Sequence, residues 1–283
     1  MRNKYKIDKD IFKKVDFPWK AYFLGWLYSD GCMSKSGYRV RLTLAEQDRN
    51  ILDTFSRLLY PEGRPLRYIA AKKFYCKKRQ KTYSRTGQYV FDINSKEVCS
   101  DLINLGVVPA KSFIVDFPSS KKVPDYLISF FVRGSFEGDG CITFRKCDGR
   151  PQISILGSEN YIHKLSKWLD NKGIVNTYCR KGNIFSLKVH KLSSINKFTD
   201  LVYNGSLELC LSRKFEKLKK CGQLKFVSRP DVPTSKYTGV DYLKRINRWT
   251  ARATINKKRY HIGCYLDEES AKLARIKFIK NHT

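Results

Sequence analysis

Two aspartates at matching positions of an internal repeat are the residues most suited to chemistry. Asp139 lies in the run FFVRGSFEGDGCITF, residues 130–144, and Asp30 lies in the similar run YFLGWLYSDGCMS, residues 22–34. If the segments before them are helices packed side by side, the two carboxylates meet at a pseudo-twofold axis. Carboxylates that close repel each other unless a cation lies between them.

A divalent cation at these carboxylates would point to phosphodiester chemistry. Hard ions such as Mg²⁺ bind one or two carboxylates together with water and phosphate oxygens, and they can activate water and hold both the attacking and leaving oxygens. We expect Mg²⁺ at Asp30 and Asp139, with Mn²⁺ or Ca²⁺ able to take its place, and carbonyl ligands at the helix ends, Gly31 and Gly140. The alternative is that both aspartates only hydrogen-bond the helix–strand turn.

Small residues mark the helices that must position these aspartates. Ala21, Gly25 and Ser29 recur every four residues, and Gly134 and Gly138 lie one helical turn apart in the second copy. A glycine inside a helix costs about 1 kcal/mol relative to alanine, and close approach of a second helix would offset that cost. The pattern therefore predicts that the two helices contact each other through these faces.

The order of elements also repeats. Residues 39–44 alternate apolar and polar side chains as a strand does, an amphipathic helix follows, and a long basic hairpin spans roughly residues 66–93 before a helix that ends at Gly106. The chain after Asp139 repeats this order. We expect an α/β (α+β) fold with two pseudo-symmetric αββαββα repeats. The expected parts are repeat 1 (1–117), repeat 2 (118–222), a linker (223–235) and a small C-terminal domain (236–283).

Charge identifies the class of partner. The chain has 56 Lys and Arg against 26 Asp and Glu, for a net charge of +30 and a pI near 9.8, which is typical of nucleic-acid binding. No apolar run approaches the roughly 18 residues of a membrane span. The nine scattered cysteines and the absence of a signal peptide predict an intracellular protein, in the cytoplasm, an organelle or a phage-infected host. Cys32 and Cys141 are expected to be small buried residues.

Polar residues of the expected strands define a candidate surface for double-stranded DNA. Two-stranded ribbons fit the major groove, where Arg reads guanine and Gln reads adenine. An ordinary solvated sheet face is the alternative for any one residue. By alternation, the face opposite the core carries Ser34, Arg39, Arg41, Thr43, Thr143, Arg145, Gln152, Ser154, Arg180 and Lys188.

The two repeated runs carry a resemblance to a known family. FLGWLYSDG and VRGSFEGDG are similar to the two LAGLIDADG motifs of single-chain homing endonucleases, and the resemblance covers roughly residues 16–222. It implies a saddle-shaped sheet in each half, a monomer with internal pseudo-twofold symmetry, and a long asymmetric DNA site. It also implies that Asp30 and Asp139 bind the metal. Glu137 is interpreted as structural, because Tyr28 replaces it in the first copy.

The same resemblance implies a lysine near each scissile phosphate, where it would stabilise developing negative charge. The family often has this lysine at the end of the last strand of each repeat. Those positions are Asn94 and His190 here, with Lys96 and Lys191 close by. Lys111 and Lys214, which match across the repeats, are the other candidates for this role.

The C-terminal residues carry a second resemblance. Residues 237–278 are similar to the plant-type Apetala-two (ethylene-response-factor-like) domain, a three-stranded sheet on one helix that reads the major groove with its sheet. An arginine common in that family is Asp241 here, and Trp249 is expected in the core. The positions that correspond to DNA contacts carry Arg248, Arg252, Thr254, Arg259 and His261.

Together these observations predict a metal-dependent, site-specific DNA endonuclease, the homing enzyme of a mobile genetic element. Each strand would be hydrolysed at the paired aspartates, leaving short 3′ overhangs as the family does. Two alternatives stay open. One is an RNA-splicing maturase of a group I intron, and the other is a regulator that binds DNA without cutting it.

Overall fold

The computed structural model describes residues 5–145, 149–205, 209–223, 235–243, 246–255 and 258–282. The chain divides into two compact units, Met1–Leu224 and Lys225–Thr283. Most of the expected linker, residues 223–235, lies outside the described residues. Among the described residues, no helix is both long enough and apolar enough to cross a bilayer.

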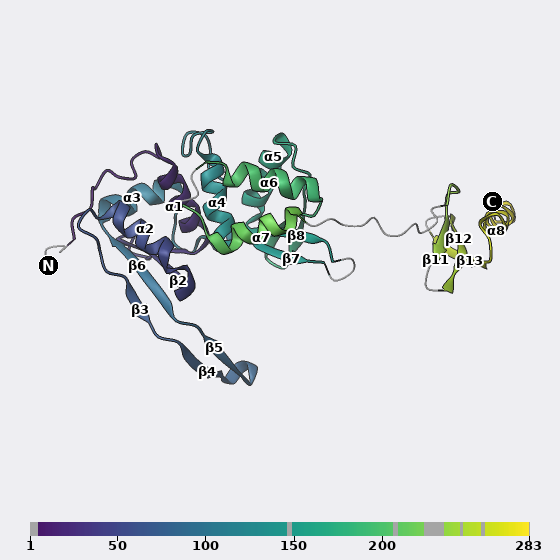
Figure 1. The fold of residues 1–283 in the computed structure, drawn as a ribbon, viewed down its shortest axis with the longest axis horizontal. Helices are drawn as coiled ribbons and strands as arrows, with labels where there is room; N and C mark the ends of the chain where they lie inside the picture. The colour runs from purple at the N-terminus through teal and green to yellow at the C-terminus, as the bar shows by residue number, and fades with distance from the viewer. Residues whose placement is uncertain are drawn as a thin grey trace. The chain divides into compact units, whose positions relative to one another are not determined.

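The first unit contains two copies of one arrangement, as the sequence predicts (Figure 1). Each copy begins with a central helix and builds an antiparallel four-stranded sheet, in the order β1-β2-β6-β3 and then β7-β8-β10-β9. The elements of the first copy are α1 (Pro18–Ser29), β1 (Gly31–Met33), β2 (Arg39–Ala45), α2 (Arg49–Leu59), β3 (Arg67–Ile69), β6 (Gln88–Asn94) and α3 (Lys96–Leu105). Those of the second are α4 (Ile128–Asp139), β7 (Cys141–Phe144), β8 (Pro151–Gly157), α5 (Glu159–Asn171), β9 (Thr177–Lys181), β10 (Ile184–Val189), α6 (Leu192–Tyr203) and α7 (Ser212–Gln223).

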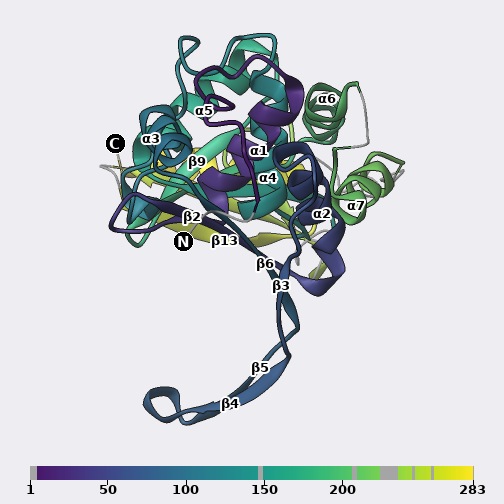
Figure 2. The same ribbon diagram turned by 90° about the vertical axis from the view of Figure 1, so that its left-hand side faces the viewer.

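An arm in the first copy breaks the symmetry. Strands β4 (Lys72–Cys76) and β5 (Lys81–Arg85) form a separate two-stranded ribbon between β3 and β6. Figures 1 and 2 show this ribbon projecting well beyond the sheet that carries it. In the second copy, β9 and β10 are joined by a turn of two residues, because Lys181 pairs directly with Ile184. The expected long hairpin is therefore present in one repeat only.

The two central helices touch through glycines. A β-carbon added to Gly25 would lie 2.2 Å from the carbonyl oxygen of Phe131, and one on Gly134 would lie 2.1 Å from that of Tyr22. No side chain fits there, so the backbones are in direct contact. Every residue of α1 from Lys20 to Tyr28 is buried, as expected for a helix enclosed on all sides. The predicted contact through small faces is confirmed.

Each sheet has one face in the core and one face open. Val40, Leu42 and Leu44 of β2 are buried, and the residues between them are more exposed. Ile153 and Ile155 of β8 are buried in the same alternating way. The helices pack against the apolar face and leave the polar face open.

The C-terminal unit is a three-stranded antiparallel sheet with one helix, as expected. Its elements are β11 (Val240–Leu243), β12 (Arg248–Ile255), β13 (Lys258–Tyr265) and α8 (Glu268–Lys280). Asp267 caps α8 by accepting a hydrogen bond from the backbone N–H of Ser270 (2.8 Å). Trp249 lies in the small core with Ala251 and Ala271, which confirms its expected position.

The glycine contact predicts a specific effect of added volume. Gly25→Ala or Gly134→Ala should lower the free energy of unfolding by about 1–3 kcal/mol, the usual cost of overpacking, because the new methyl group meets backbone that can only move with its helix. Gly222→Ala in α7 is the matched control. Its β-carbon would meet the side chain of Asn196 at 2.7 Å, which can rotate away. Thermal unfolding followed by circular dichroism measures all three, and equal melting temperatures would contradict the contact.

Candidate metal centre and nucleic-acid interface

The helix contact brings the two aspartates to one surface. Asp30 is the residue after the last turn of α1, and Asp139 is the last residue of α4. A β-carbon on Gly138 would lie 2.8 Å from a carboxylate oxygen of Asp30, so this carboxylate lies against the residue next to Asp139. Both aspartates keep exposed surface. Burial, together with the charge of Asp139, raises the pKa of Asp30 to about 6, and burial also raises the pKa of Asp139.

These carboxylates fit a hard divalent ion. Their proximity disfavours two negative charges, and a cation between them would remove that cost. Among the described residues, no group of three or more His, Cys, Asp and Glu side chains could hold a metal. The chain would thus supply two carboxylates and leave the remaining positions to water and phosphate, which suits Mg²⁺. The carbonyl of Gly140, an expected ligand, accepts a hydrogen bond from Lys214 (2.6 Å).

The two matched lysines lie at the ends of the central helices. Lys111 and Lys214 are each only 9% exposed. Lys111 Nζ donates to the carbonyl of Ser29 at 2.8 Å. Lys214 Nζ lies in reach of four carbonyls at the end of α4, those of Phe136 (2.9 Å), Glu137 (2.6 Å), Gly138 (3.3 Å) and Gly140 (2.6 Å). Burial lowers the pKa of both ammonium groups, that of Lys214 to about 8.

Glu137 lies inside the fold, as its interpretation as a structural residue requires. It is 1% exposed, accepts a hydrogen bond from the hydroxyl of Tyr22, and accepts another from the backbone N–H of Leu211 (2.8 Å). Burial raises the pKa of Glu137 to about 7, and these hydrogen bonds only partly oppose the shift. It joins α1, α4 and the segment that leads into α7.

One turn earlier, Arg133 is fully buried and donates to the carbonyls of Val202 (2.7 Å), Asn204 (2.9 Å) and Leu209 (2.9 Å). This guanidinium holds the end of α6 and the segment that follows it. Neither Arg133 nor the partners of Glu137 were expected from the sequence, since they connect residues 69 to 115 positions apart.

Strand register places most of the expected DNA-facing residues on the open face. Arg41 pairs with Cys32 and Asp92, and Ser154 pairs with Cys141 and Lys188. Arg41 also forms an ion pair with Asp92 (2.7 Å). The backbone N–H groups of Ser34 and Arg145 close the β1–β2 and β7–β8 hairpins. Positions on this face, in agreement with alternation, are Arg39, Arg41, Thr43, Thr143, Gln152, Ser154 and Lys188.

The prediction that Arg180 lies on the open face is wrong. It pairs with Phe185, which shares the core-side face of β10 with the fully buried Leu187. Its guanidinium Nε donates to the carbonyl of Gly182 (3.1 Å). Thr177 and Lys181 share the face of Lys188 instead, and Arg67 of β3 shares that of Thr43. The two-residue turn after Lys181 sets this register. Recognising that turn in the sequence would have placed Arg180 on the core-side face.

The expected burial of Cys32 and Cys141 is also wrong. Both are exposed. Each is the first outward residue after its glycine, so the pleat turns it to the open face opposite Arg41 and Ser154.

The expected DNA contacts of the C-terminal unit share one face of its sheet. Arg252 pairs with His261, and Thr254 pairs with Arg259. Trp249 and Ala251 lie on the other face of this sheet, which packs on Ala271 of α8. Arg248 lies four residues before Arg252 on the same strand, so it points to the same side. Arg252 forms an ion pair with Asp241, the residue that departs from the resembled family.

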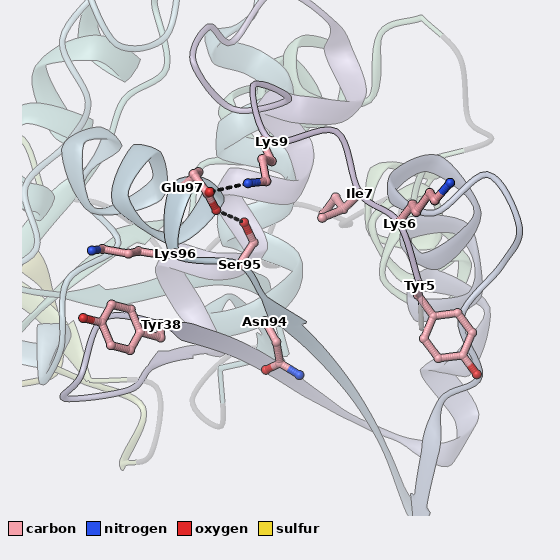
Figure 3. Close-up of a pocket in the computed structure, with 9 residues that line it drawn as sticks. All are labelled: Tyr5, Lys6, Ile7, Lys9, Tyr38, Asn94, Ser95, Lys96 and Glu97. Carbon is pink, nitrogen blue, oxygen red and sulfur yellow. Dashed lines mark hydrogen bonds and ion pairs between the residues drawn. The ribbon is translucent and has the colours of Figure 1, made fainter. Parts of the chain in front are cut away.

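Two of the cavities show where the candidate centre lies. One of about 600 Å³ is formed by the N-terminal residues, Tyr38 and the end of β6 (Figure 3). There Lys9 pairs with Glu97 (2.5 Å), and no aspartate of the candidate centre takes part. A smaller cavity, of about 220 Å³, is lined by Asp139, Lys111, Ser29 and Ser135, among others. The smaller one therefore belongs to the candidate metal centre.

Comparison with known proteins identifies the fold. No protein-family model and no curated protein matches the sequence. Among solved structures, the homing endonuclease I-WcaI bound to its DNA recognition sequence is 11% identical with a TM-score of 0.50, over 72% of this chain and 87% of that one. The LAGLIDADG meganuclease I-AabMI bound to uncleaved DNA is 13% identical with a TM-score of 0.43, over 72% and 88%. Full-length DUF199/WhiA from Thermatoga maritima is 14% identical with a TM-score of 0.41, over 77% and 66%.

This chain thus has a fold like that of LAGLIDADG homing endonucleases, at low sequence identity. This likeness supports the two-repeat architecture and leaves the chemistry to be argued from the residues.

The raised pKa of Glu137 predicts how stability depends on pH. The folded acid keeps its proton up to about pH 7, whereas the unfolded one releases it near 4.5. Glu137 is therefore a stronger acid in the unfolded state. The free energy of unfolding that this group contributes is lost as the pH rises from about 4.5 to about 7. Glu137→Gln should remove this loss, so its stability relative to the wild type should rise by on the order of 2 kcal/mol across the window.

Urea unfolding at pH 5, 6, 7 and 8 measures this difference. Ser135→Ala is the control, since it removes the buried hydrogen bond to Tyr161 (2.5 Å) without removing a group that titrates in this range. It should lower stability equally at every pH. A constant difference between Glu137→Gln and the wild type would show that Glu137 is ionised throughout.

Proposed function

We propose that this chain is a site-specific, metal-dependent homing endonuclease that cuts double-stranded DNA at the paired aspartates. The observation that carries the proposal is the glycine contact between α1 and α4, which brings Asp30 and Asp139 together. A strand of a sheet whose polar face is open begins directly after Asp30 and one residue after Asp139. The chain acts as a monomer, and its internal repeat replaces a second subunit.

Different residues of the chain would have different roles in the proposed reaction. Asp30 and Asp139 would hold Mg²⁺, which when bound supplies Lewis-acid stabilisation and a more acidic water. The two sheets align the duplex so that the scissile phosphates lie over the aspartates. The net charge of +30 attracts DNA of any sequence, and the open sheet faces supply the contacts that distinguish bases.

Residues 236–283 would form an accessory DNA-binding domain. Tethering it to the first unit raises its effective concentration at the same DNA molecule, which increases affinity without new contacts in the core. Arg248, Arg252, Thr254, Arg259 and His261 supply a polar face for this role. The ion pair of Arg252 with Asp241 reduces the charge that this arginine offers to a base.

Removing either carboxylate tests the mechanism. Asp30→Asn and Asp139→Asn should each abolish double-strand cleavage in Mg²⁺ and leave DNA binding intact or slightly tighter, because a negative charge near phosphate is lost. Asp125→Asn, an exposed aspartate before α4, is the matched control and should cut like the wild type. The assay is cleavage of DNA carrying the uninterrupted insertion site of the gene.

Full cutting by both Asp30→Asn and Asp139→Asn would contradict the mechanism. Tight binding by the wild type with no nicking in Mg²⁺ or Mn²⁺ would favour the regulator. Preference for intron RNA over duplex DNA would favour the maturase.

The arm is a second expected DNA contact. Residues 70–87 contain seven Lys and Arg and no Asp or Glu. Phe74 and Tyr75 are about half exposed, at 48% and 59%, and the ring of Phe74 stacks on that of Tyr83 with centroids 5.9 Å apart. Cations interleaved with exposed aromatic rings are typical of nucleic-acid contacts. We therefore include the arm in the proposed DNA surface, on the side of repeat 1.

Repeat 2 provides a template for removing the arm. Ile69 pairs with Gln88 as Lys181 pairs with Ile184, so residues 70–87 can be replaced by Gly-Asn, the turn of repeat 2. This variant should bind a long duplex at least 10-fold more weakly near 0.1 M salt, and the slope of log affinity against log salt should shrink by roughly 2–5. Lys167→Ala on the exposed side of α5 should change neither quantity. Unchanged binding by the arm variant would exclude the arm from the interface.

A further inference from the structure

A thiol, an imidazole and a hydroxyl meet on the open face of the C-terminal sheet. The imidazole Nε2 of His261 lies 3.9 Å from the sulfur of Cys264, and its Nδ1 lies 3.3 Å from the hydroxyl oxygen of Thr250. Cys264 and His261 are both exposed, whereas Thr250 is only 2% exposed. A nucleophile beside a base, with the base oriented by a third group, is the arrangement found at activated nucleophiles.

A β-bulge brings the thiol and the imidazole to the same face. In a regular strand, residues three positions apart lie on opposite faces, so the sheet would separate His261 from Cys264. In β13, however, Ile262 interrupts the pairing, because its neighbours His261 and Gly263 pair with consecutive residues of β12. Ile262 packs against the small core instead. Bulges are common next to active sites, where they re-aim a side chain.

Thr250 fixes how the imidazole is oriented. Its hydroxyl is buried, and buried hydroxyl groups have hydrogen-bond partners, a role that His261 Nδ1 fills here. When Nδ1 carries the ring proton and donates it to Thr250, Nε2 is left as an acceptor. That nitrogen faces the sulfur of Cys264 and can take the proton of the thiol. In the described part of the chain, no imidazole is hydrogen-bonded to Cys179, an exposed cysteine of β9.

The charges around this thiol favour an anionic reagent. Arg252 and Arg259 lie on the same face of the sheet as Cys264. The carboxylate of Asp241 lies on that face too, and its ion pair with Arg252 neutralises it. An exposed thiol on a basic, open face is accessible to a small disulfide that carries carboxylates, such as a disulfide of the glutathione class.

We propose that Cys264 is a reactive thiol that forms a mixed disulfide with a small anionic disulfide, with His261 as its base and Thr250 as a positioning residue. The sulfur of Cys264 attacks one sulfur of the reagent while His261 takes the thiol proton. The S–S bond of the reagent breaks, and the released thiolate takes that proton from the imidazolium. Cys264 is thereby oxidised, and the released sulfur is reduced to a thiol.

The modification would also act on DNA binding, a consequence that rests on the proposed function. The added group would lie on the face that carries Arg252 and Arg259, the proposed DNA contacts of this unit. It would bring negative charge and bulk to a surface that must approach phosphates. The accessory domain would therefore release DNA when Cys264 is modified and bind it again when the disulfide is reduced.

Peptide-resolved kinetics test the assignment. The full chain is treated with oxidised glutathione at pH 7 and quenched with acid at timed intervals, and modification of each cysteine peptide is quantified by mass spectrometry. Cys264 should react about 10-fold faster than Cys179. This gain is smaller than positioned bases usually give, because a thiol already ionises in part at pH 7. In urea the two thiols should react at the same rate, since the arrangement is lost.

Variants of the two partners separate the base from the scaffold. His261→Gln keeps an amide that can bond to Thr250 but cannot take the thiol proton, so Cys264 should slow to the rate of Cys179. Thr250→Val should slow Cys264 in part, and Thr250→Ser should restore its rate. Equal rates for Cys264 and Cys179 in the wild type would overturn the proposal, as would an unchanged Cys264 rate in His261→Gln.

Duplex DNA tests the consequence for binding. A long duplex in excess should shield Cys264 of the wild type from oxidised glutathione. Rapid modification of Cys264 without such shielding would support the reactive thiol and contradict the proposed DNA-binding role of this sheet. Failure of the thiol proposal and failure of the proposed function are therefore distinguished.

Discussion

The contact between Gly25 and Gly134 is the constraint on which the first unit depends. Added β-carbons at these positions would come within 2.2 and 2.1 Å of backbone carbonyl oxygens on the other helix, so any side chain would separate α1 from α4. Separation would pull apart the helix ends that carry Asp30 and Asp139, and also the sheets attached to them. The glycines cost helical stability. The close packing of two buried helices offsets that cost.

This packing concentrates charge at the helix ends. Two carboxylates that keep exposed surface, two buried lysines and several helix carbonyls lie together. Desolvation raises the pKa of Asp30 and Asp139 and lowers that of Lys111 and Lys214. The carboxylates and ammonium groups partly balance each other. In the proposed function, a bound divalent ion would complete this balance, and a DNA phosphate would bring negative charge that the lysines and the basic sheets attract.

The repeats share a topology but differ on their surfaces. Repeat 1 has the basic arm, whereas repeat 2 has a two-residue turn at the same place. Arg213 of α7 crosses to repeat 1, where both its bonds, at 2.8 and 2.7 Å, reach the buried Asp48 at the start of α2. A symmetric scaffold with asymmetric surfaces suits the recognition of a DNA sequence that is itself asymmetric.

Local patterns in the sequence determined much of the fold and of the candidate site. The spacing of small residues predicted the helix contact, alternation predicted the open faces of β2 and β8, and the repeat paired Asp30 with Asp139, because each of these signals lies within a short stretch of chain. Only the tertiary structure decided which face of β9 carries Arg180 and that Cys32 and Cys141 are exposed. It also decided that Glu137 is buried and bonded to the backbone of Leu211. These depend on which strand or segment lies opposite, and that partner is set by pairing between distant parts of the chain. The same holds for Lys111 and Lys214, which match in sequence and differ because only the folded helix ends decide how many carbonyls each one meets.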